Sequence, residues 1–260
     1  MIEISKKITT NVGRTNAKFG LIKENDRIMI GFSGGKDSLT LFHTLNRMQK
    51  KAPFKFDFKA VTITYGMGEQ IEFLSNHCKE HGIEHEIIDT QIFDLAGEKI
   101  RKNSSFCSFF SRMRRGYLYT TALEQGYNKI ALGHHLDDAM ESYFMNLFYN
   151  GTMRTMPPIY KANNGLEVIR PLIFCRERQL RAFADSNEIR VIGDEACPGL
   201  RFDVKMPHAR ATTKELLAKL EEQNPKIFVS MKAAFSNIQL PTFFYNNLKD
   251  INLNIKDENI

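Results

Sequence analysis

Short apolar runs and amphipathic helical patterns alternate along most of this chain. Ile28, Met29 and Ile30, for example, form a continuous apolar run, as expected of a strand that is buried on both faces. Runs of this kind predict five strands, at residues 27–32, 56–64, 84–88, 129–132 and 167–172. Helical spacing of apolar residues predicts helices at 1–25 (ending near Gly20), 37–50, 69–82, 107–126, 136–149 and 176–187.

This alternation of strand and helix is typical of an α/β fold, in which helices cover both faces of a parallel sheet. We therefore expect a Rossmann-like, five-stranded parallel sheet in residues 26–200, preceded by an N-terminal helical segment at 1–25. Farther on, the pattern is less regular and predicts helices at 213–222 and 226–237. Residues 201–260 are thus expected to form a short helical C-terminal extension with a frayed tail.

The composition excludes several protein classes. No run approaches the roughly 18 apolar residues of a membrane-spanning helix, and the N-terminus lacks the apolar core of a signal peptide. The four cysteines are too few and too scattered for a secreted disulfide scaffold, so we expect a cytoplasmic enzyme. The net charge of +6 permits a polyanionic partner.

The first predicted strand leads into the loop Ser-Gly-Gly-Lys-Asp-Ser (33–38) and then into a helix. Two glycines let the backbone approach an anion closely, and the free N–H groups of the helix N-terminus attract phosphate oxygens. Lys36 adds a positive charge, while Ser33 and Ser38 offer hydroxyls. The spacing differs from that of a Walker A loop, which has four residues between its first Gly and Gly-Lys. The loop therefore predicts a phosphate-binding site of another class.

The fourth predicted strand is followed by a second polar motif, Gly133-His134-His135-Leu136-Asp137-Asp138. Because ligands in such sheets lie at the carboxyl ends of the strands, we expect this motif to lie near the loop at 33–38. Adjacent carboxylates beside a phosphate site suit Mg²⁺, which prefers oxygen ligands. Taken alone, the motif also fits a fragment of a metal phosphohydrolase, or helix capping by an aspartate. Together with the loop, it favours a nucleotide site.

Several stretches carry a resemblance to a known family: SGGKDSLTL (33–41), SRMRRGYLY (111–119) and LGHHLDDAMESYFMNLFYNG (132–151), then Met156-Pro157-Pro158, Arg170-Pro171-Leu172 and Ala196-Cys197. The loop alone resembles the PP-loop of the ATP pyrophosphatase superfamily. Together the stretches resemble the tRNA 2-thiocytidine synthetase family, over about residues 10–240. The resemblance implies an adenine nucleotide alpha hydrolase-like fold and makes residues 26–200 the PP-loop ATP pyrophosphatase domain.

The resemblance implies an ATP-dependent tRNA-modifying enzyme. ATP would adenylate the C2 oxygen of an anticodon-loop cytidine and release pyrophosphate, and sulfide would then displace AMP. The residues implied for the pyrophosphate are Ser33, Gly34, Gly35, Asp37 and Ser38, with Lys36 neutralising developing charge. Those implied for the adenosine are Thr64 or Tyr65, Gly133 and His134. Asp138, with Asp137 second, would bind Mg²⁺, and Arg170 would contact phosphate or support the site.

Members of this family hold an iron–sulfur cluster with three cysteines, two of them in a C-x-x-C motif. Here Cys107 matches the first position and Cys197 the third, but Phe110 stands at the second. Phenylalanine cannot ligate iron, and two thiolates leave a four-iron cluster two ligands short. A labile cluster with a non-cysteine ligand, or a persulfide on Cys107 or Cys197, would preserve thiolation; otherwise the thiols are reduced and buried. Cys175 would substitute only if its helix brought it near.

Basic residues gather beside the first of these cysteines, where Arg112, Arg114 and Arg115 are followed by Tyr117 and Tyr119. Basic and aromatic side chains together suit an RNA backbone and a splayed base, although a solvated helix face is the alternative interpretation. A separate run, Asn-His-Cys-Lys-Glu-His (76–81), allows metal binding at its cysteine, but an ordinary helix thiol is favoured there.

Two other functions stay open on the sequence. One is adenylation of another substrate, as in lysidine synthesis, and the other is a nucleotide- or RNA-binding protein without enzymatic activity. The favoured interpretation implies ATP and Mg²⁺ as cofactors and leaves an iron–sulfur cluster open. It implies tRNA and a sulfur donor protein or sulfide as partners, and no membrane; a homodimer is compatible with the sequence.

Overall fold

The computed structural model describes residues 2–99, 106–193, 198 and 208–243. The chain divides into two compact units, residues 1–212 and 213–260. The first unit contains the whole sheet. The second contains most of α8 (His208–Gln223), all of α9 (Ile227–Ala234) and a 3-10 helix at Leu240–Thr242. Among the described residues, no helix is both long and apolar enough to cross a membrane.

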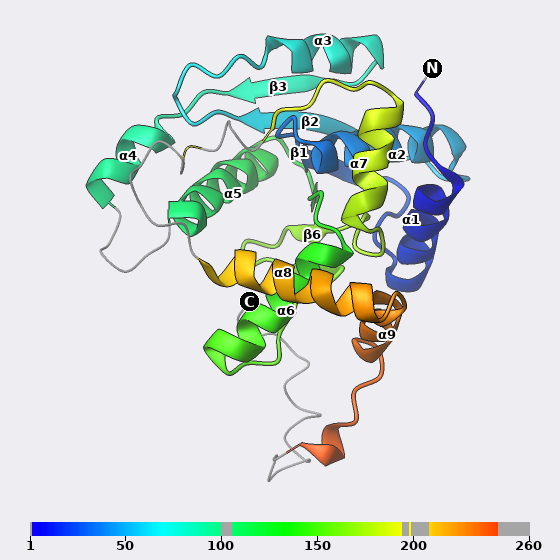
Figure 1. The fold of residues 1–260 in the computed structure, drawn as a ribbon. Helices are drawn as coiled ribbons and strands as arrows, with labels where there is room; N and C mark the ends of the chain where they lie inside the picture. Colours follow the sequence, from blue (N-terminus) through cyan, green and yellow to red (C-terminus); the bar gives the residue numbers. More distant parts are fainter. Residues whose placement is uncertain (1, 100–105, 194–197, 199–207, 244–260) are drawn as a thin grey trace. The chain divides into compact units, whose positions relative to one another are not determined.

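The sheet has six strands in the order β3-β2-β1-β4-β6-β5 (Figure 1). The strands are β1 (Arg27–Gly31), β2 (Asp57–Ile63), β3 (His85–Ile88), β4 (Lys129–Ala131), β5 (Ile159–Lys161) and β6 (Glu167–Ile169). Neighbouring strands are parallel except β5 and β6, which are antiparallel. The predicted Rossmann-like sheet is therefore confirmed, with one strand more than the five expected.

The additional strand, β5, lies at the edge of the sheet and is only three residues long. A tight turn joins it to β6, in which the Gly165 N–H donates to the Ala162 carbonyl at 2.9 Å. Gly165 has a φ of 90°, which favours glycine at this position. Three residues are too few to show a strand period, so the sequence pattern did not reveal β5.

The helices of the first unit lie close to their expected positions. They are α1 (Lys6–Phe19), α2 (Lys36–Lys51), α3 (Glu72–Glu80), α4 (Ile92–Lys99), α5 (Phe106–Glu124), α6 (Leu136–Asn150) and α7 (Glu177–Ser186). The first helix begins where the Ser5 hydroxyl accepts from the Ile8 N–H, and it ends at Gly20 in a left-handed conformation. Only α4 was not expected, because eight residues are too short a stretch to show a clear helical spacing of apolar residues.

Two apolar clusters sandwich the sheet, because alternate strand residues point to opposite faces. Ile28 and Ile30 pack with α1, α2, α3 and α7 in one cluster. Met29, between them, packs with α4 and α5 in the other (Figure 1). The helices thus cover both faces of the sheet and leave the ends of its strands uncovered.

The chain reverses its direction across the sheet between β1 and β4. From β1 it proceeds to β2 and β3 on one side, whereas from β4 it proceeds to β6 on the other. Such a reversal leaves a crevice at the carboxyl ends of the two central strands, which is where open parallel sheets bind ligands. The two polar motifs identified in the sequence follow these two strands.

Candidate functional site

The loop after β1 leaves the N-terminus of α2 open. Gly35 is the N-cap residue, and no side chain caps the helix there. The Ser38 hydroxyl donates to the Gly35 carbonyl at 2.9 Å, and the Ser33 hydroxyl lies 3.3 Å from that of Ser38. The first N–H groups of α2 therefore point out of the loop, where an anion can accept them.

Gly34 is held in a left-handed conformation, with a φ of 77°. Its carbonyl accepts from the Ile192 N–H at 2.8 Å, and a Cβ on Gly34 would lie only 2.6 Å from the Ile192 Cδ1. The segment after α7 thus packs directly on the loop. No sequence motif pointed to Ile192, because its role depends on a contact with a residue far away along the chain.

Gly133, at the end of β4, brings the second motif against the loop. A Cβ at this position would lie 3.0 Å from the carbonyl carbon of Asp37 and 3.2 Å from the Ser38 nitrogen. A side chain at this position would push the backbone of Asp37 away by a few tenths of an ångström, so glycine permits the close approach without a shift. The expectation that the two motifs lie side by side is therefore confirmed.

Asp37 carries a carboxylate oxygen with an unusual environment. Its Oδ1 is buried and accepts no hydrogen bond from any described residue. Burial raises the pKa of Asp37, against the opposing charges of His135 and Lys36. The ammonium of Lys36 lies 3.6 Å from this oxygen and 3.2 Å from the Glu177 carboxylate. A buried oxygen without a donor is a site that a cation can satisfy.

Asp138 caps α6 and faces the same crevice. Its Oδ2 accepts from the His135 N–H at 3.1 Å, and its Oδ1 accepts from Arg210 at 2.6 Å. Burial raises the pKa of Asp138, but its interactions with His135, including the backbone N–H of that residue, and with Arg210 outweigh that effect and hold the pKa below its usual value. Asp138 is therefore an anion beside the loop, and helix capping, weighed in the sequence as an alternative, occurs as well.

Asp137 points to α7 instead. Its Oδ1 accepts from the Arg176 Nε at 3.0 Å, and its Oδ2 accepts from the Glu177 N–H at 2.7 Å. These bonds join the start of α6 to the start of α7, so they also position the carboxylate of Glu177 that pairs with Lys36. Neither Arg176 nor Glu177 was singled out in the sequence, since each acts through residues about 40 or more positions away.

His134 is half-buried and neutral. Arg170 donates from Nε to its Nδ1 at 3.2 Å and from Nη1 to the Pro157 carbonyl at 2.6 Å. Burial, followed by the positive charge of Arg170, lowers the pKa of His134 to about 4. Of the two roles weighed for Arg170, this geometry corresponds to support of the site.

Two adjoining cavities open at these motifs. The larger, of about 430 Å³, is lined by Asp37, Gly133, His134, Asp138 and Arg210 on one side and by α5 on the other. The smaller, of about 370 Å³, is lined by the residues after β2, including Thr64, Tyr65 and Glu69, and by Ile192. Ser33, Ile63, Tyr65 and Arg114 line both cavities, so the two form adjoining compartments.

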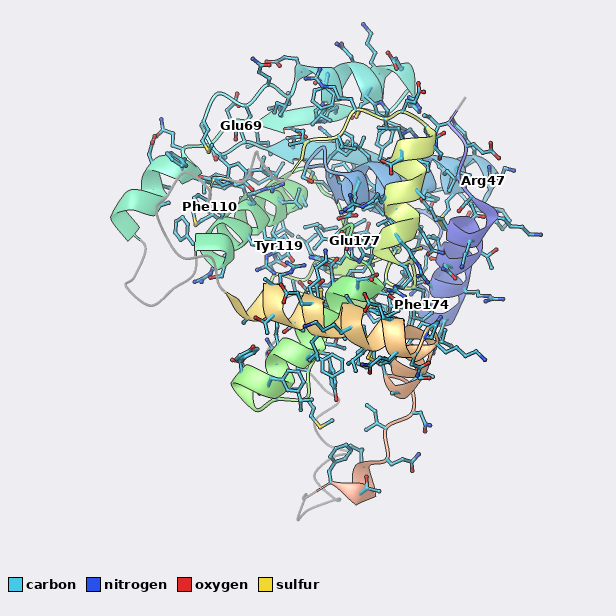
Figure 2. The ribbon with its side chains drawn as sticks, viewed as in Figure 1. Arg47, Glu69, Phe110, Tyr119, Phe174 and Glu177 are labelled. Carbon is cyan, nitrogen blue, oxygen red and sulfur yellow. The ribbon has the colours of Figure 1, made fainter. Side chains whose placement is uncertain are left out.

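Phe110 lines the larger cavity from the first turns of α5, the helix that also carries Tyr119 (Figure 2). It is 3% exposed, and its ring packs edge-on against that of Tyr65 at 5.6 Å. Cys175 does not replace the missing thiolate, because it is buried in the core cluster on the other face of the sheet. The side chains of Cys107 and Cys197 lie outside the described residues.

The arginines predicted to contact RNA differ in their surroundings. Arg112 and Arg115 are exposed, whereas Arg114 is partly buried. Arg114 donates to the Tyr65 hydroxyl at 2.8 Å, and its guanidinium lies 5.1 Å from the centre of that ring. Arg115 lines the larger cavity. The basic residues of α5 thus lie partly on its exposed face and partly at the larger cavity, and Arg115 belongs to both groups.

Comparisons with known proteins agree with this arrangement. The PP-loop domain family matches residues 4–205. The tRNA-cytidine(32) 2-sulfurtransferase of Geobacter metallireducens is 43% identical over 237 residues, which are 90% of each chain. That of Pseudomonas syringae is 37% identical over 260 residues, 98% of this chain and 92% of the relative. The U34-tRNA thiolase of Methanococcus maripaludis, solved with its [4Fe-4S] cluster, shares the fold, with a TM-score of 0.74, 24% identity and coverage of 94% and 82%.

Proposed function

We propose that this protein is an ATP-dependent enzyme that thiolates a cytidine of the tRNA anticodon loop. The chain belongs to the tRNA-cytidine(32) 2-sulfurtransferase family of PP-loop proteins, and this membership supports the proposal. ATP adenylates the C2 oxygen of the cytidine and releases pyrophosphate. Sulfur then replaces that oxygen, and AMP leaves.

A single contact carries the assignment to this crevice. Gly133, which has no Cβ, lies against the backbone of Asp37. This contact places the phosphate-binding loop next to the His134–Asp138 segment. A nucleotide phosphate on the N-terminus of α2 would then meet Lys36, Asp138 and His134 at once. Neither motif alone offers both the anion site and the carboxylates.

We infer that ATP spans the two cavities. Its pyrophosphate lies on Ser33, Gly34, Gly35, Asp37 and Ser38, and its adenosine extends along Thr64, Gly133 and His134. This placement is supported by Ser33, which lines both cavities. Ile192 would hold the loop closed behind the phosphates, since its N–H binds the Gly34 carbonyl.

Mg²⁺ fits the carboxylates of this crevice. The buried Oδ1 of Asp37 lacks a donor among the described residues, and Asp138 is an anion in the same cavity. Oxygen ligands of this kind are those that Mg²⁺ prefers, and the bound ion would neutralise charge on the phosphates. Asp137 is the weaker candidate, because it points to α7, where it accepts from Arg176 and Glu177, and it is not among the residues that line the larger cavity.

Adenylation follows from this geometry as an in-line displacement at the α-phosphorus. The C2 oxygen of the cytidine forms the new P–O bond, and the bond to the β-phosphate oxygen breaks with its electron pair on pyrophosphate. Lys36 and the N–H groups at the start of α2 stabilise the charge that develops there. Lys36 pairs with Glu177 at 3.2 Å, so phosphate binding would exchange one anion for another.

In the second step, a sulfur nucleophile attacks C2, the C–S bond forms, and the bond from C2 to the oxygen of AMP breaks. Free sulfide can supply this sulfur directly and loses its proton as the product forms. Alternatively, Cys107 or Cys197 carries the sulfur as a persulfide received from a persulfide of the donor protein, and after attack on C2 the other of the two thiols breaks the S–S bond, which leaves 2-thiocytidine and a Cys107–Cys197 disulfide. Among the described residues, no cysteine lines the larger cavity, and Phe110 occupies the position of the family's middle ligand. We therefore derive no step through an iron–sulfur cluster.

The tRNA would approach along α5. Arg112 and Arg115 are exposed there, and Arg115 also reaches the larger cavity. Exposed guanidinium groups bind backbone phosphates, while a cavity beside them can accept a base turned out of the anticodon loop. Arg114 contributes through Tyr65, which it orients between the two cavities.

The test compares tRNA from cells with and without the gene. Loss of 2-thiocytidine in the deletion strain, restored by the wild-type gene but not by Lys36→Ala, supports the proposal. The matched control is Gly13→Ala, since a Cβ at Gly13 meets nothing within 4 Å, and it should restore the nucleoside fully. Unchanged 2-thiocytidine in the deletion strain would refute the assignment.

A second candidate function rests on Phe110 alone. If the missing cysteine has abolished sulfur transfer, the purified protein will still release pyrophosphate from ATP with tRNA or another substrate, while thionucleosides stay unchanged. The same experiment therefore separates thiolation from simple adenylation. A cytoplasmic location agrees with both functions, and the homodimer stays a prediction.

A further inference from the structure

Three histidine rings meet on the helical layer away from the two cavities. His43 comes from α2, whereas His77 and His81 come from the last turn of α3 and the residue that follows it. One ring nitrogen from each lies within 4.8 Å of the others, and the Nε2 atoms of His43 and His77 are 2.9 Å apart. Zn–N bonds of about 2.0–2.1 Å in a tetrahedral site place ligand nitrogens roughly 3.3 Å apart, so these spacings lie on either side of the required value.

The hydrogen bond of His81 fixes which of its nitrogens carries the proton. Its Nδ1 lies 3.1 Å from the His77 carbonyl oxygen, and a carbonyl can only accept. The proton is therefore on Nδ1, and Nε2 presents a lone pair. A backbone carbonyl on the second ring nitrogen is the usual outer support of a metal-binding histidine.

The rings of His43 and His77 face each other through their Nε2 atoms, which lie 2.9 Å apart. At this distance only one of the two nitrogens carries a proton, so the other presents a lone pair. An ion between them would accept a lone pair from each ring, with the proton of each imidazole on Nδ1.

A cavity of about 310 Å³ gives this cluster access to solvent, and His43 and His81 both line it. Asn46, one turn after His43, lines it as well, and its buried Oδ1 accepts no hydrogen bond from the residues that the structure describes. A water molecule on a metal ion would supply the missing donor. The site thus offers three nitrogen ligands, an open fourth position and a polar group beside it.

Cys78 is not part of this cluster, although it follows His77 directly. It is fully buried in the apolar core, and burial raises the pKa of its thiol to about 12. The favoured sequence interpretation, an ordinary helix thiol, therefore agrees with its surroundings. The signal for the metal site came instead from His43, which lies 34 residues before His77.

We propose that His43, His77 and His81 bind a divalent transition-metal ion such as zinc, with water or hydroxide as the fourth ligand. Three imidazoles suit zinc better than they suit Mg²⁺ or an iron–sulfur cluster. Arg47, Lys50 and Lys51 at the cavity favour an anionic fourth ligand such as hydroxide.

The role of the ion is structural. It joins α2 to α3, which otherwise meet through side-chain packing, and α2 is the helix whose N-terminus forms the phosphate site. His43 lies two turns from Lys36, about 10 Å along the helix axis. Arg47, one turn farther along α2, lies far from Phe110 in Figure 2. The ion would therefore stabilise the helix without touching ATP.

The experiment titrates the metal-free full chain with Zn²⁺ by calorimetry, after treatment with a chelator. A Cys107→Ser, Cys197→Ser background removes the two thiols that could bind zinc elsewhere. We expect one equivalent to bind, and the melting temperature to rise by about 5 °C or more at saturating Zn²⁺. His81→Gln should weaken binding by about 100-fold or more.

The matched control is His85→Gln. His85 is also a half-buried neutral histidine, with Thr62 and Ser75 hydroxyls 2.8 Å from its ring nitrogens, but it is not part of the cluster. Zinc affinity equal to wild type in His85→Gln and lost in His81→Gln supports the site. Stoichiometric binding unaffected by His81→Gln would overturn it, as would the absence of any binding or a cobalt spectrum with thiolate charge-transfer bands.

Discussion

Arg170 donates a hydrogen bond from its Nε to the Nδ1 of His134 at 3.2 Å, at the carboxyl ends of β4 and β6. Because Nδ1 accepts, the proton of neutral His134 is on Nε2, the nitrogen available to a ligand in the larger cavity. Arg170 therefore fixes both the tautomer and the charge of His134. The Arg170 side chain is itself buried, with an exposed fraction of 5%. Its guanidinium lies over the Tyr160 ring and donates to the Pro157 carbonyl.

Replacing Arg170 by methionine should raise the pKa of His134 from about 4 toward its usual value, because the adjacent positive charge is removed while burial persists. A folded-state pKa below the unfolded one means that the unfolded chain binds the extra proton first. Stability linked to His134 is therefore present above about pH 6.5 and declines as the pH falls toward 4.

Titration of the His134 ring by NMR measures this shift directly. The Arg170→Met protein should also lose less stability between pH 6.5 and 4 than the wild type does. A ring pKa that stays near 4 in the variant would show that burial alone neutralises His134.

Gly133→Ala should reduce pyrophosphate release by about 100-fold or more, because its Cβ would lie 3.0 Å from the carbonyl carbon of Asp37 and would displace the loop from the carboxylates. The measurement is the rate of pyrophosphate release with ATP and unmodified tRNA. Gly13→Ala is the control: it lies within α1 with no neighbour near its Cβ, and should leave the rate unchanged while stabilising the fold by up to about 1 kcal/mol. Equal rates in both variants would contradict the close approach.

Asp37→Asn should make the protein more stable and less active. Burial of its Oδ1 makes the charged form of the carboxyl group less stable and raises its pKa. A neutral amide removes the free-energy cost of holding a charge there at neutral pH. We expect a rise in melting temperature of about 1–3 °C together with loss of Mg²⁺-dependent pyrophosphate release. Retained activity with the same Mg²⁺ dependence would show that Asp37 does not serve the metal.

Phe110→Cys should increase the iron and labile sulfide that remain bound after purification without oxygen. Phe110 lines the larger cavity, and a cysteine in its place restores the C-x-x-C spacing with Cys107. Removing a buried ring that packs on Tyr65 should also destabilise the protein, by about 2–4 kcal/mol. Phe109→Cys places the thiol about 100° away around the same helix and should bind no additional iron. Equal iron in the two variants would refute the cluster geometry.

Arg112→Ala and Arg115→Ala should each weaken tRNA binding and reduce the dependence of the affinity on salt by about one unit of slope. Both side chains are exposed on α5, where a phosphate can accept their hydrogen bonds. The matched control, Arg47→Ala, removes the same charge from the exposed part of α2, far from Phe110 (Figure 2). A slope that falls equally in all three variants would mean that α5 has no special role in binding tRNA.

From the sequence we could predict five of the six strands, the two polar motifs and their meeting at the carboxyl ends of β1 and β4. Apolar runs and helical spacing are local signals, and the connection rules of parallel sheets then leave few arrangements. The same signals were too short for β5 and α4. The resemblance added the chemistry of ATP and tRNA, as well as the vacancy that Phe110 leaves in the cysteine pattern.

The contacts between distant side chains, by contrast, could not be predicted before the fold was known. The contact of Ile192 with Gly34, the pairing of Arg170 with His134, and the meeting of His43 with His77 and His81 all join residues that are far apart along the chain. Local periodicity states which face of an element is buried, but not which residue of another element packs against it. That choice depends on strand order, helix position and side-chain direction, which are properties of the folded chain as a whole.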